Sequence, residues 1–347
     1  MFPGISSQWQ TERDEIVKLS YLNLQTIDPT YNLAVEQYVF DSLPRDRSYL
    51  MLWQNDRAVI IGRYQNTLAE INEGYVRENG IQVVRRLSGG GAVYHDLGNL
   101  NYTFITDAGD LSQLDFQHFC QPVVRALMAQ GVRAEIMGRN DITIDGKKIS
   151  GNSQYLRNGR IMHHGTLLFD SNLNVISEAL CSDIEKIQSK GIKSIHSRVT
   201  NIRPYLTEDI SLTEFREVLL NSILEYTPGH EYCLSTQETA EIEDLRRKRY
   251  ATWEWNYGTS PPGTMHKKRR IEGCGRIDAY ISIREGLIES FAFQGDFFSA
   301  EDPELLSRRF LGIRPDYESY RKVLRETDIT RYFFGITESE FLRLLCE

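Results

Sequence analysis

The chain has 347 residues, of which 41% are hydrophobic and 25% are charged, and its net charge is −8. This composition is ordinary for a soluble globular protein, the length predicts two domains, and the acidic balance argues against non-specific nucleic-acid binding. The 5 cysteines are widely spaced, which argues against a disulfide framework or structural zinc. Neither a signal peptide nor an apolar run of roughly 18–20 residues is found, so we expect a cytoplasmic protein without a membrane partner.

The first part of the chain predicts a helix, two buried strands, a second helix and a further strand. Asp28 can cap the first helix, and Pro29 suits its first position. Short apolar runs indicate the strands, and Gly80 ends the second helix. The expected ranges are 31–43, 50–53, 58–61, 71–79 and 81–87.

The middle of the chain carries two hairpin signals. Asp145-Gly146 and Asn158-Gly159 each separate two strand-like runs and supply the positive φ angles of type I′ turns. Because such antiparallel hairpins are interleaved with helices, the predicted fold class is α+β with a mixed α/β sheet, not a doubly wound sheet. Further helices are expected over 114–130, 212–225 and 236–250.

A stretch rich in Gly and Pro, Tyr257–Gly263, predicts a linker. After it, 276–283 and 287–293 suggest a hairpin, and short helices follow. We therefore expect a main domain over residues 1–256, a linker over 257–263 and a small α+β domain over 264–347.

The most informative segment is Arg85–His95, in which three consecutive glycines, Gly89–Gly91, lie between two strand-like runs. Glycines let backbone N–H groups approach an anion closely, and Arg85 or Arg86 can add a bidentate phosphate contact. The segment is neither a Walker A loop nor a Rossmann fingerprint. A flexible turn with solvated arginines is the alternative, but the polar residues that follow favour a phosphate site.

Alternation along the first hairpin distinguishes its two adjacent lysines. Lys148 falls on the polar face with Asp141, whereas Lys147 falls at the turn end of the apolar face. A solvent-exposed hairpin is the alternative, but the small polar residues 151–153 favour a ligand-facing edge. The two-residue turn would pair Ile144 with Lys147, Thr143 with Lys148, Ile142 with Ile149 and Asp141 with Ser150.

Ordered motifs along most of the chain resemble the signature of the lipoate–protein ligase A family. The resemblance runs from about residue 20 to the end, and it includes a mild departure at Tyr94, where family members often have Phe. The motifs are Asn32–Glu36, Arg86–Asn101, Gly138–Asp141, Lys148–Gly151, His163–Thr166, Lys190–Asn201 and Trp253–Asn256.

This resemblance implies a catalytic domain of the biotin/lipoyl-ligase type, related to class II tRNA synthetases, and a small accessory domain that rotates between steps. Lipoate and ATP, with Mg²⁺, would form lipoyl-AMP and pyrophosphate, and the lipoyl group would then pass to a lysine of a carrier protein. The implied carriers are lipoyl domains of 2-oxoacid dehydrogenase complexes and the H protein of the glycine cleavage system. A monomeric enzyme without a bound prosthetic group is expected.

The resemblance also assigns site residues. Trp53 matches a pocket residue near the lipoate tail, and it fits a plain core position nearly as well. His95 fits a structural hydrogen-bond anchor as well as it fits a ligand contact. His163 and His164 are adjacent on a strand and face opposite sides, so one of them lines the site. The ATP or adenylate contacts would be Arg86, Ser88, Gly90, Gly91, Ala92, Val93, Tyr94, Asn99, Lys148, Ser197 and Arg198. The lipoate contacts would be Trp53, Arg86, Lys148, His163 and Gly165.

Lys148 and Asp141 are the expected catalytic residues. The acyl carboxylate and the α-phosphate are both anionic, so the cationic Lys148 would act as an electrostatic catalyst. Asp141 would either favour the free amine of the carrier lysine or bind Mg²⁺. An ATP-independent octanoyl or lipoyl transferase using Cys181 is an alternative, and a non-enzymatic binding protein is another. Arg86, Lys148 and the 190–201 loop favour the ATP route.

Overall fold

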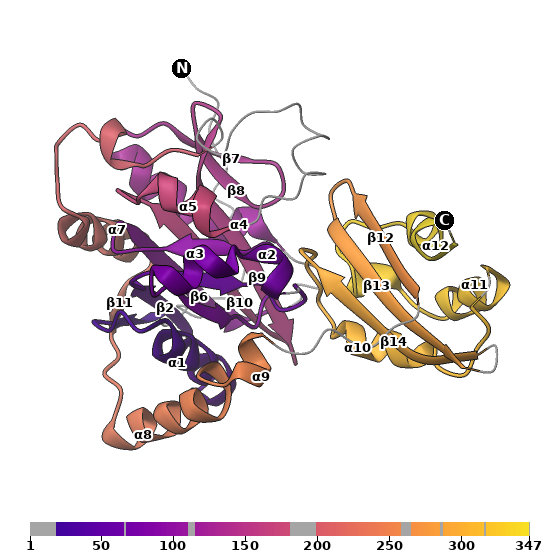
Figure 1. Ribbon diagram of the computed structural model, residues 1–347. Coiled ribbons are helices and arrows are strands. Elements are labelled where there is room, and N and C mark those ends of the chain that lie inside the picture. The colour runs from indigo at the N-terminus through magenta and orange to yellow at the C-terminus, as the bar shows by residue number, and fades with distance from the viewer. Residues whose placement is uncertain are drawn as a thin grey trace.

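The computed structural model describes residues 19–65, 67–109, 115–180, 199–257, 265–284, 287–315 and 317–346. These residues form a larger body and a smaller, C-terminal body that lie side by side (Figure 1). No helix within these ranges is long and apolar enough to span a membrane.

The larger body is built on an eight-stranded sheet in the order β11-β1-β2-β6-β10-β9-β8-β7. β1 pairs parallel with β11 and β2, and the other pairs are antiparallel, which confirms the mixed sheet. The strands are β1 (Leu19–Asn23), β2 (Ser48–Trp53), β6 (Asn99–Asp107), β7 (Ala134–Met137), β8 (Asp141–Ile144), β9 (Lys147–Arg157), β10 (Arg160–Leu168) and β11 (Gly229–Glu231). The helices of this body are α1 (Pro29–Ser42), α2 (Thr67–Glu70), α3 (Glu73–Glu78), α4 (Phe116–Ala129), α5 (Leu173–Ala179), α7 (Leu212–Tyr226), α8 (Thr236–Leu245) and α9 (Trp253–Asn256), with helical turns at Arg203–Tyr205 and Arg246–Tyr250.

Helices cover both faces of this sheet, because its central strands are apolar on both sides. On β2, Leu50 and Leu52 pack in the cluster that includes α4 and α7. Met51 and Trp53 pack in the opposite cluster, with α1 and α8. The period of two along β2 thus divides one apolar strand between two cores.

Local signals placed the helix ends well. The Asp28 side chain accepts hydrogen bonds from the backbone N–H groups of Thr30 (2.8 Å) and Tyr31 (3.4 Å), and Pro29 begins α1, as predicted. The helix expected over 236–250 is instead divided into α8 and a π-helical turn, Arg246–Tyr250.

A second sheet of the larger body carries the Gly-rich run. It consists of β4 (Gln82–Arg85), β3 (Ala58–Ile61) and β5 (Val93–His95), in that order. β3 is parallel to β4 and antiparallel to β5. The run of glycines therefore connects two strands, as the sequence predicted.

Both predicted hairpin turns are confirmed, since Asp145 and Gly146 have φ of 50° and 73°, and Asn158 and Gly159 have φ of 50° and 70°. The register of the first hairpin is correct only next to the turn, where Ile144 pairs with Lys147 and Thr143 with Lys148.

Beyond these pairs the prediction was wrong, because Ile142 pairs with Ser150, not Ile149, and Asp141 pairs with Gly151, not Ser150. A β-bulge inserts one residue into β9, and a two-residue turn contains no signal for that insertion. The bulge moves Ser150 to the side of the buried Ile142 and brings Gly151 opposite Asp141.

The smaller body is a three-stranded antiparallel sheet covered by helices. Its predicted hairpin is confirmed by β13 and β14, whereas most of the predicted linker, residues 258–263, lies outside the described ranges. Its core is rich in phenylalanine, including Phe293, Phe310 and Phe341. The elements are β12 (Met265–Ile271), β13 (Gly275–Arg284), β14 (Leu287–Gly295), α10 (Pro303–Arg309), α11 (Tyr317–Arg325) and α12 (Glu338–Cys346), with a 3₁₀ turn at Ile329–Arg331.

Candidate active site

A cavity of about 130 Å³ lies where the large sheet faces the Gly-rich run. Side chains from α1, β2, β3, β6, β9 and β10 line it, together with Gly90–Val93. Phe298 of the smaller body completes the wall.

One row of residues crosses the sheet beneath this cavity over five neighbouring strands. Trp53 on β2 is opposite Asn101 on β6, which is opposite Thr166 on β10. The Gly151 N–H of β9 donates to the Thr166 hydroxyl (3.3 Å), and Gly151 is opposite Asp141 on β8. Neighbouring strands lie about 4.8 Å apart, so the row spans about 19 Å from an indole to a carboxylate.

Lys148 lies at the charged end of this row. Its Nζ is 2.7 Å from Asp141 Oδ1, and the two side chains remain 37% and 36% exposed. Water screens such a pair, so Lys148 can exchange Asp141 for another anion at little cost. Gly151 makes room for this side chain, because a Cβ at that position would lie 2.9 Å from Lys148 Nζ.

The two arginines of the Gly-rich segment have different surroundings. Arg85 turns away from the cavity, and its Nη1 donates to the backbone carbonyls of Gly62 (2.8 Å) and Gln65 (2.7 Å). Its Nε donates to the carbonyl of Trp255 (3.0 Å). Arg85 therefore connects β4 to a neighbouring loop and to α9.

Arg86 lines the cavity and Arg85 does not, whereas the local sequence did not distinguish them. Its Nη2 donates to the carbonyls of Gly89 (2.6 Å) and Gly91 (2.8 Å), so the guanidinium holds the Gly-rich run in shape. Burial lowers the pKa of Arg86 to about 10, and Glu36 offsets part of that fall. The guanidinium therefore remains charged at neutral pH.

The other expected ATP contacts are divided between the cavity and the structure behind it. Gly90, Gly91, Ala92 and Val93 line the cavity. Ser88, Tyr94 and Asn99 do not: Tyr94 packs in an apolar cluster, and Asn99 Nδ2 donates to Asn101 Oδ1 (2.9 Å). Ser197 and Arg198, as well as Cys181, lie outside the described residues.

His164, not His163, faces the cavity. His163 points to the opposite side of β10, where it stacks on Phe119 at 5.1 Å and lies 2.9 Å from Gln154 Nε2. Burial lowers the pKa of His163 well below its usual value. The alternation of β10 predicted that the two rings face opposite sides, but only the packing of the helices shows which side is the cavity.

The apolar end of the cavity is formed by Trp53, Leu33 and Ile60. The Trp53 indole N–H donates to Thr103 Oγ1 (3.0 Å), which fixes the ring. Gly165 also lines the cavity, and a Cβ there would lie 2.6 Å from the Tyr102 hydroxyl behind it.

Sequence reasoning missed several of the lining residues. Leu33 and Asn140 lie inside motifs that the resemblance singled out, so their position in those motifs could have suggested them. Phe298 had no such signal. It reaches the cavity because the Gly90 N–H donates to the Phe297 carbonyl (3.1 Å), a contact between segments about 200 residues apart in sequence.

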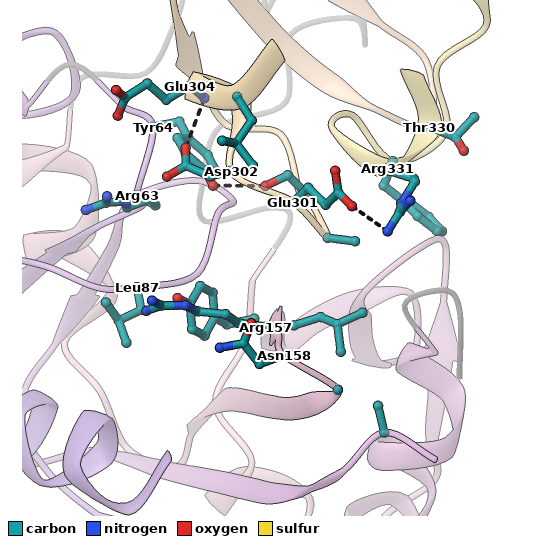
Figure 2. Close-up of a pocket in the computed structure, with 18 of the residues that line it drawn as sticks. Arg63, Tyr64, Leu87, Arg157, Asn158, Glu301, Asp302, Glu304, Thr330 and Arg331 are labelled. Atoms are coloured by element: carbon teal, nitrogen blue, oxygen red, sulfur yellow. Dashed lines mark hydrogen bonds and ion pairs between the residues drawn. The ribbon is translucent and has the colours of Figure 1, made fainter. Parts of the chain in front are cut away.

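A larger cleft of about 1290 Å³ lies between the two bodies. Figure 2 shows Leu87, Arg157 and Asn158 of the larger body across this cleft from Glu301 and Asp302 of the smaller one. The cleft is lined by neither Lys148 nor the Gly90–Val93 run, so its size does not make it the reaction site.

Within the ranges that the structure describes, no group of three or more His, Cys, Asp or Glu side chains is arranged to hold a metal ion. Asp141 offers one carboxylate, 2.7 Å from the Nζ of the cavity-lining Lys148. Mg²⁺ commonly uses one or two carboxylates together with substrate phosphates, so this donor fits a metal that enters with a nucleotide.

Comparison with known proteins identifies the class to which this fold and site belong. A family model described as the lipoyl protein ligase A/B catalytic domain matches residues 28–224, and one described as the bacterial lipoate protein ligase C-terminus matches residues 260–345. The chain belongs to the lipoate–protein ligase family.

Lipoate-protein ligase LplJ of Bacillus subtilis is 45% identical over 322 residues, which cover 92% of this chain and 97% of that protein. The fold matches LipL1 of P. falciparum in complex with lipoate, with a TM-score of 0.76, 23% identity and coverage of 94% and 97% of the two chains.

Two shorter structures also match. A bipartite lipoate protein ligase of Thermoplasma acidophilum, described with its E2 lipoyl domain, has a TM-score of 0.63 and 30% identity, covering 72% of this chain and 100% of its own. A lipoate-protein ligase A bound with ATP has a TM-score of 0.59 and 28% identity, covering 70% of this chain and 98% of its own.

Proposed function

We propose that this protein is an ATP-dependent lipoate–protein ligase, which forms lipoyl-AMP and transfers the lipoyl group to a lysine of a carrier protein. The observation that carries the proposal is the row from Trp53 to Asp141, which joins an apolar end to a charged end beside Lys148 and Arg86. Family membership and the ATP-bound relative support the same function.

In the first step, a carboxylate oxygen of lipoate attacks the α-phosphorus of ATP. An O–P bond forms, the bond to the β-phosphate breaks, and pyrophosphate leaves. Lys148 and Arg86, which both line the cavity, would supply positive charge to the reacting groups, and Gly91–Val93 would supply the adjoining backbone wall. Fixed charges that strengthen their contacts as the anionic transition state forms lower its free energy.

In the second step, the carrier's lysine amine attacks the acyl carbon. A C–N bond forms, the C–O bond to AMP breaks, and the amine must lose a proton. Deprotonating a lysine at pH 7 costs about 4–5 kcal/mol from its reference pKa. We infer that Asp141, beside Lys148, accepts that proton and that Lys148 polarises the acyl carbonyl.

Asp141 has a second role open to it, as a ligand of Mg²⁺. A bound Mg²⁺ supplies charge neutralisation of the ATP phosphates. Asp141 would hold it in the first step and would be free again once pyrophosphate has left. Both roles require the carboxylate to separate from Lys148, which the exposure of the pair makes inexpensive.

The carrier that we infer is a lipoyl domain or an H protein, and the E2 lipoyl domain named with the Thermoplasma relative supports this class. We further infer a catalytic domain over 1–256, a linker over 257–263 and an accessory domain over 264–347. The two matched ranges, 28–224 and 260–345, support that division.

The test is pyrophosphate release from ATP with lipoate, octanoate or biotin in parallel, followed by mass analysis of an added lipoyl domain. We expect release that depends on lipoate and a carrier whose mass rises by one lipoyl group. Transfer from an acyl donor without ATP would instead support a thiol route.

A further inference from the structure

A buried hydrogen-bond chain runs behind the cavity wall and begins at its apolar end. Trp53 Nε1 lies 3.0 Å from Thr103 Oγ1, which lies 2.7 Å from Glu36 Oε1. An indole N–H only donates, so the Thr103 hydroxyl oxygen accepts from it. The Thr103 O–H in turn donates a hydrogen bond to the carboxylate. This acyl branch therefore has one possible direction.

A second branch begins at the phosphate end. Arg86 Nε lies 3.1 Å from Ser88 Oγ, which lies 2.6 Å from His164 Nε2, and His164 Nδ1 lies 2.8 Å from Glu36 Oε1. A guanidinium N–H only donates, so the Ser88 hydroxyl oxygen accepts from Arg86 Nε and also lies in hydrogen-bond contact with His164 Nε2. His164 in turn contacts Glu36 Oε1 through Nδ1, so its ring bridges Ser88 and Glu36.

Both branches therefore end on the same carboxylate oxygen of Glu36. Glu36 is 1% exposed, and Thr103 and Ser88 are 0% and 1% exposed. Because Glu36, Thr103 and Ser88 are shielded from water, a displaced member of the chain cannot re-form its hydrogen bond elsewhere at low cost. The branches come from α1, β2, β6, β10 and the Gly-rich run, so only the tertiary fold assembles them.

We propose that Glu36, Thr103, His164 and Ser88 are positioning residues that couple the two ends of the cavity: the placement of Trp53 by the acyl chain sets the orientation of Arg86. The proposal rests on the function proposed above. Arg86 in turn holds the Gly89 and Gly91 carbonyls, so the coupling reaches the wall against which the nucleotide would lie. Neither Thr103 nor Ser88 lines the cavity, and neither needs to touch a substrate.

The experiment is a double-mutant cycle on pyrophosphate release, with Thr103→Val on the acyl branch and Ser88→Ala on the phosphate branch. At saturating lipoate, we expect Thr103→Val to lower kcat/KM for ATP about fivefold to tenfold, the effect of one buried hydrogen bond. The double variant should fall by less than the product of the single effects, and Thr103→Ser, which keeps the hydroxyl, should restore activity.

Thr106→Val is the matched control. It removes a hydroxyl from the same strand, where Ser48 Oγ lies 2.8 Å from Thr106 Oγ1 outside this chain of bonds. It should leave activity near that of the wild type and combine with Ser88→Ala additively. Thermal unfolding of every variant is the check that the protein is folded.

An effect of Thr103→Val on KM for lipoate alone, or strict additivity of the pair, would overturn the coupling. If the wild-type protein releases no pyrophosphate in response to lipoate, the proposed function itself is wrong. Calorimetric titration with lipoate distinguishes a failure of the coupling from a failure of the proposed function. If the two ends are coupled, Ser88→Ala, which lies on the phosphate branch, must still weaken lipoate binding. Unchanged binding in that variant also counts against the coupling.

Discussion

Asp141 Oδ1 lies 2.7 Å from Lys148 Nζ, and a β-bulge in β9 places Asp141 opposite Gly151 instead of Ser150. Had the two-residue turn set the whole register, the serine side chain would stand beside this pair. The glycine leaves that space open, so the lysine can move between Asp141 and a substrate anion.

We expect Lys148→Ala to slow lipoyl-AMP formation by about 10²–10³-fold, the usual effect of removing one electrostatic contact to a transition state. Pyrophosphate release in a single turnover measures this step directly. Lys147→Ala is the matched control, because Lys147 is exposed and no ion pair of its side chain is found among the described residues. Equal rates in the two variants would remove Lys148 from the mechanism.

We expect Asp141→Asn to impair overall lipoylation, and the step that slows distinguishes its two roles. A general base contributes roughly 10²–10⁴-fold, so slow transfer from preformed lipoyl-AMP would assign that role. Slow adenylation with a raised Mg²⁺ requirement would assign metal binding. Normal turnover in both steps would exclude both roles.

Replacing Gly165 with alanine should destabilise the fold by about 1–3 kcal/mol, because the added Cβ would crowd the Tyr102 hydroxyl and Asn152 Oδ1. The free energy of unfolding in urea measures this. Gly74→Ala, in helix α3 with only Asn72 Oδ1 at 3.7 Å, is the control and should be neutral or stabilising by up to about 1 kcal/mol. Equal stability of Gly165→Ala and the wild type would show that the sheet relaxes around the methyl group.

Acid should destabilise the protein through His95. Burial, and then the charge of Arg86, lower the pKa of His95 to about 3 from 6.5. Below pH 6.5 the unfolded chain binds a proton that the folded one does not, so this group lowers the unfolding free energy by about 1.4 kcal/mol per pH unit down to pH 3. Urea unfolding between pH 7 and pH 5 should show a smaller slope for His95→Gln than for the exposed-residue control His230→Gln.

Cys181→Ser should retain ATP-dependent lipoylation, because the proposed route uses an adenylate and no thiol. Carrier mass after reaction with ATP and lipoate measures it. Loss of all transfer in a folded Cys181→Ser protein would contradict the adenylate route and support a thiol acyltransferase.

Local sequence predicted the parts of the site that local physics governs. Asp28 and Pro29 predicted the start of α1, and the two Asp-Gly and Asn-Gly dipeptides predicted the hairpin turns. The strand period showed that Lys147 and Lys148 differ and that His163 and His164 face opposite sides.

Other features of the site needed the assembled fold. The choice of His164 over His163 depends on packing between elements far apart in the chain, and the bulge that pairs Asp141 with Gly151 is not encoded by the two-residue turn of its hairpin. The same holds for Phe298, which comes from the smaller body. No local pattern encodes such contacts, because their partners are chosen by which faces are buried together.

The sequence by itself therefore determined the elements, the Gly-rich connection and the polar-face position of Lys148, whereas it chose Arg86 over Arg85 only through the family resemblance. Only the tertiary structure decided that Trp53, Asn101, Thr166, Gly151 and Asp141 form one row across five strands. The reason is that strand order and register set the distances between residues up to about 110 positions apart, and both follow from burying two apolar faces at once.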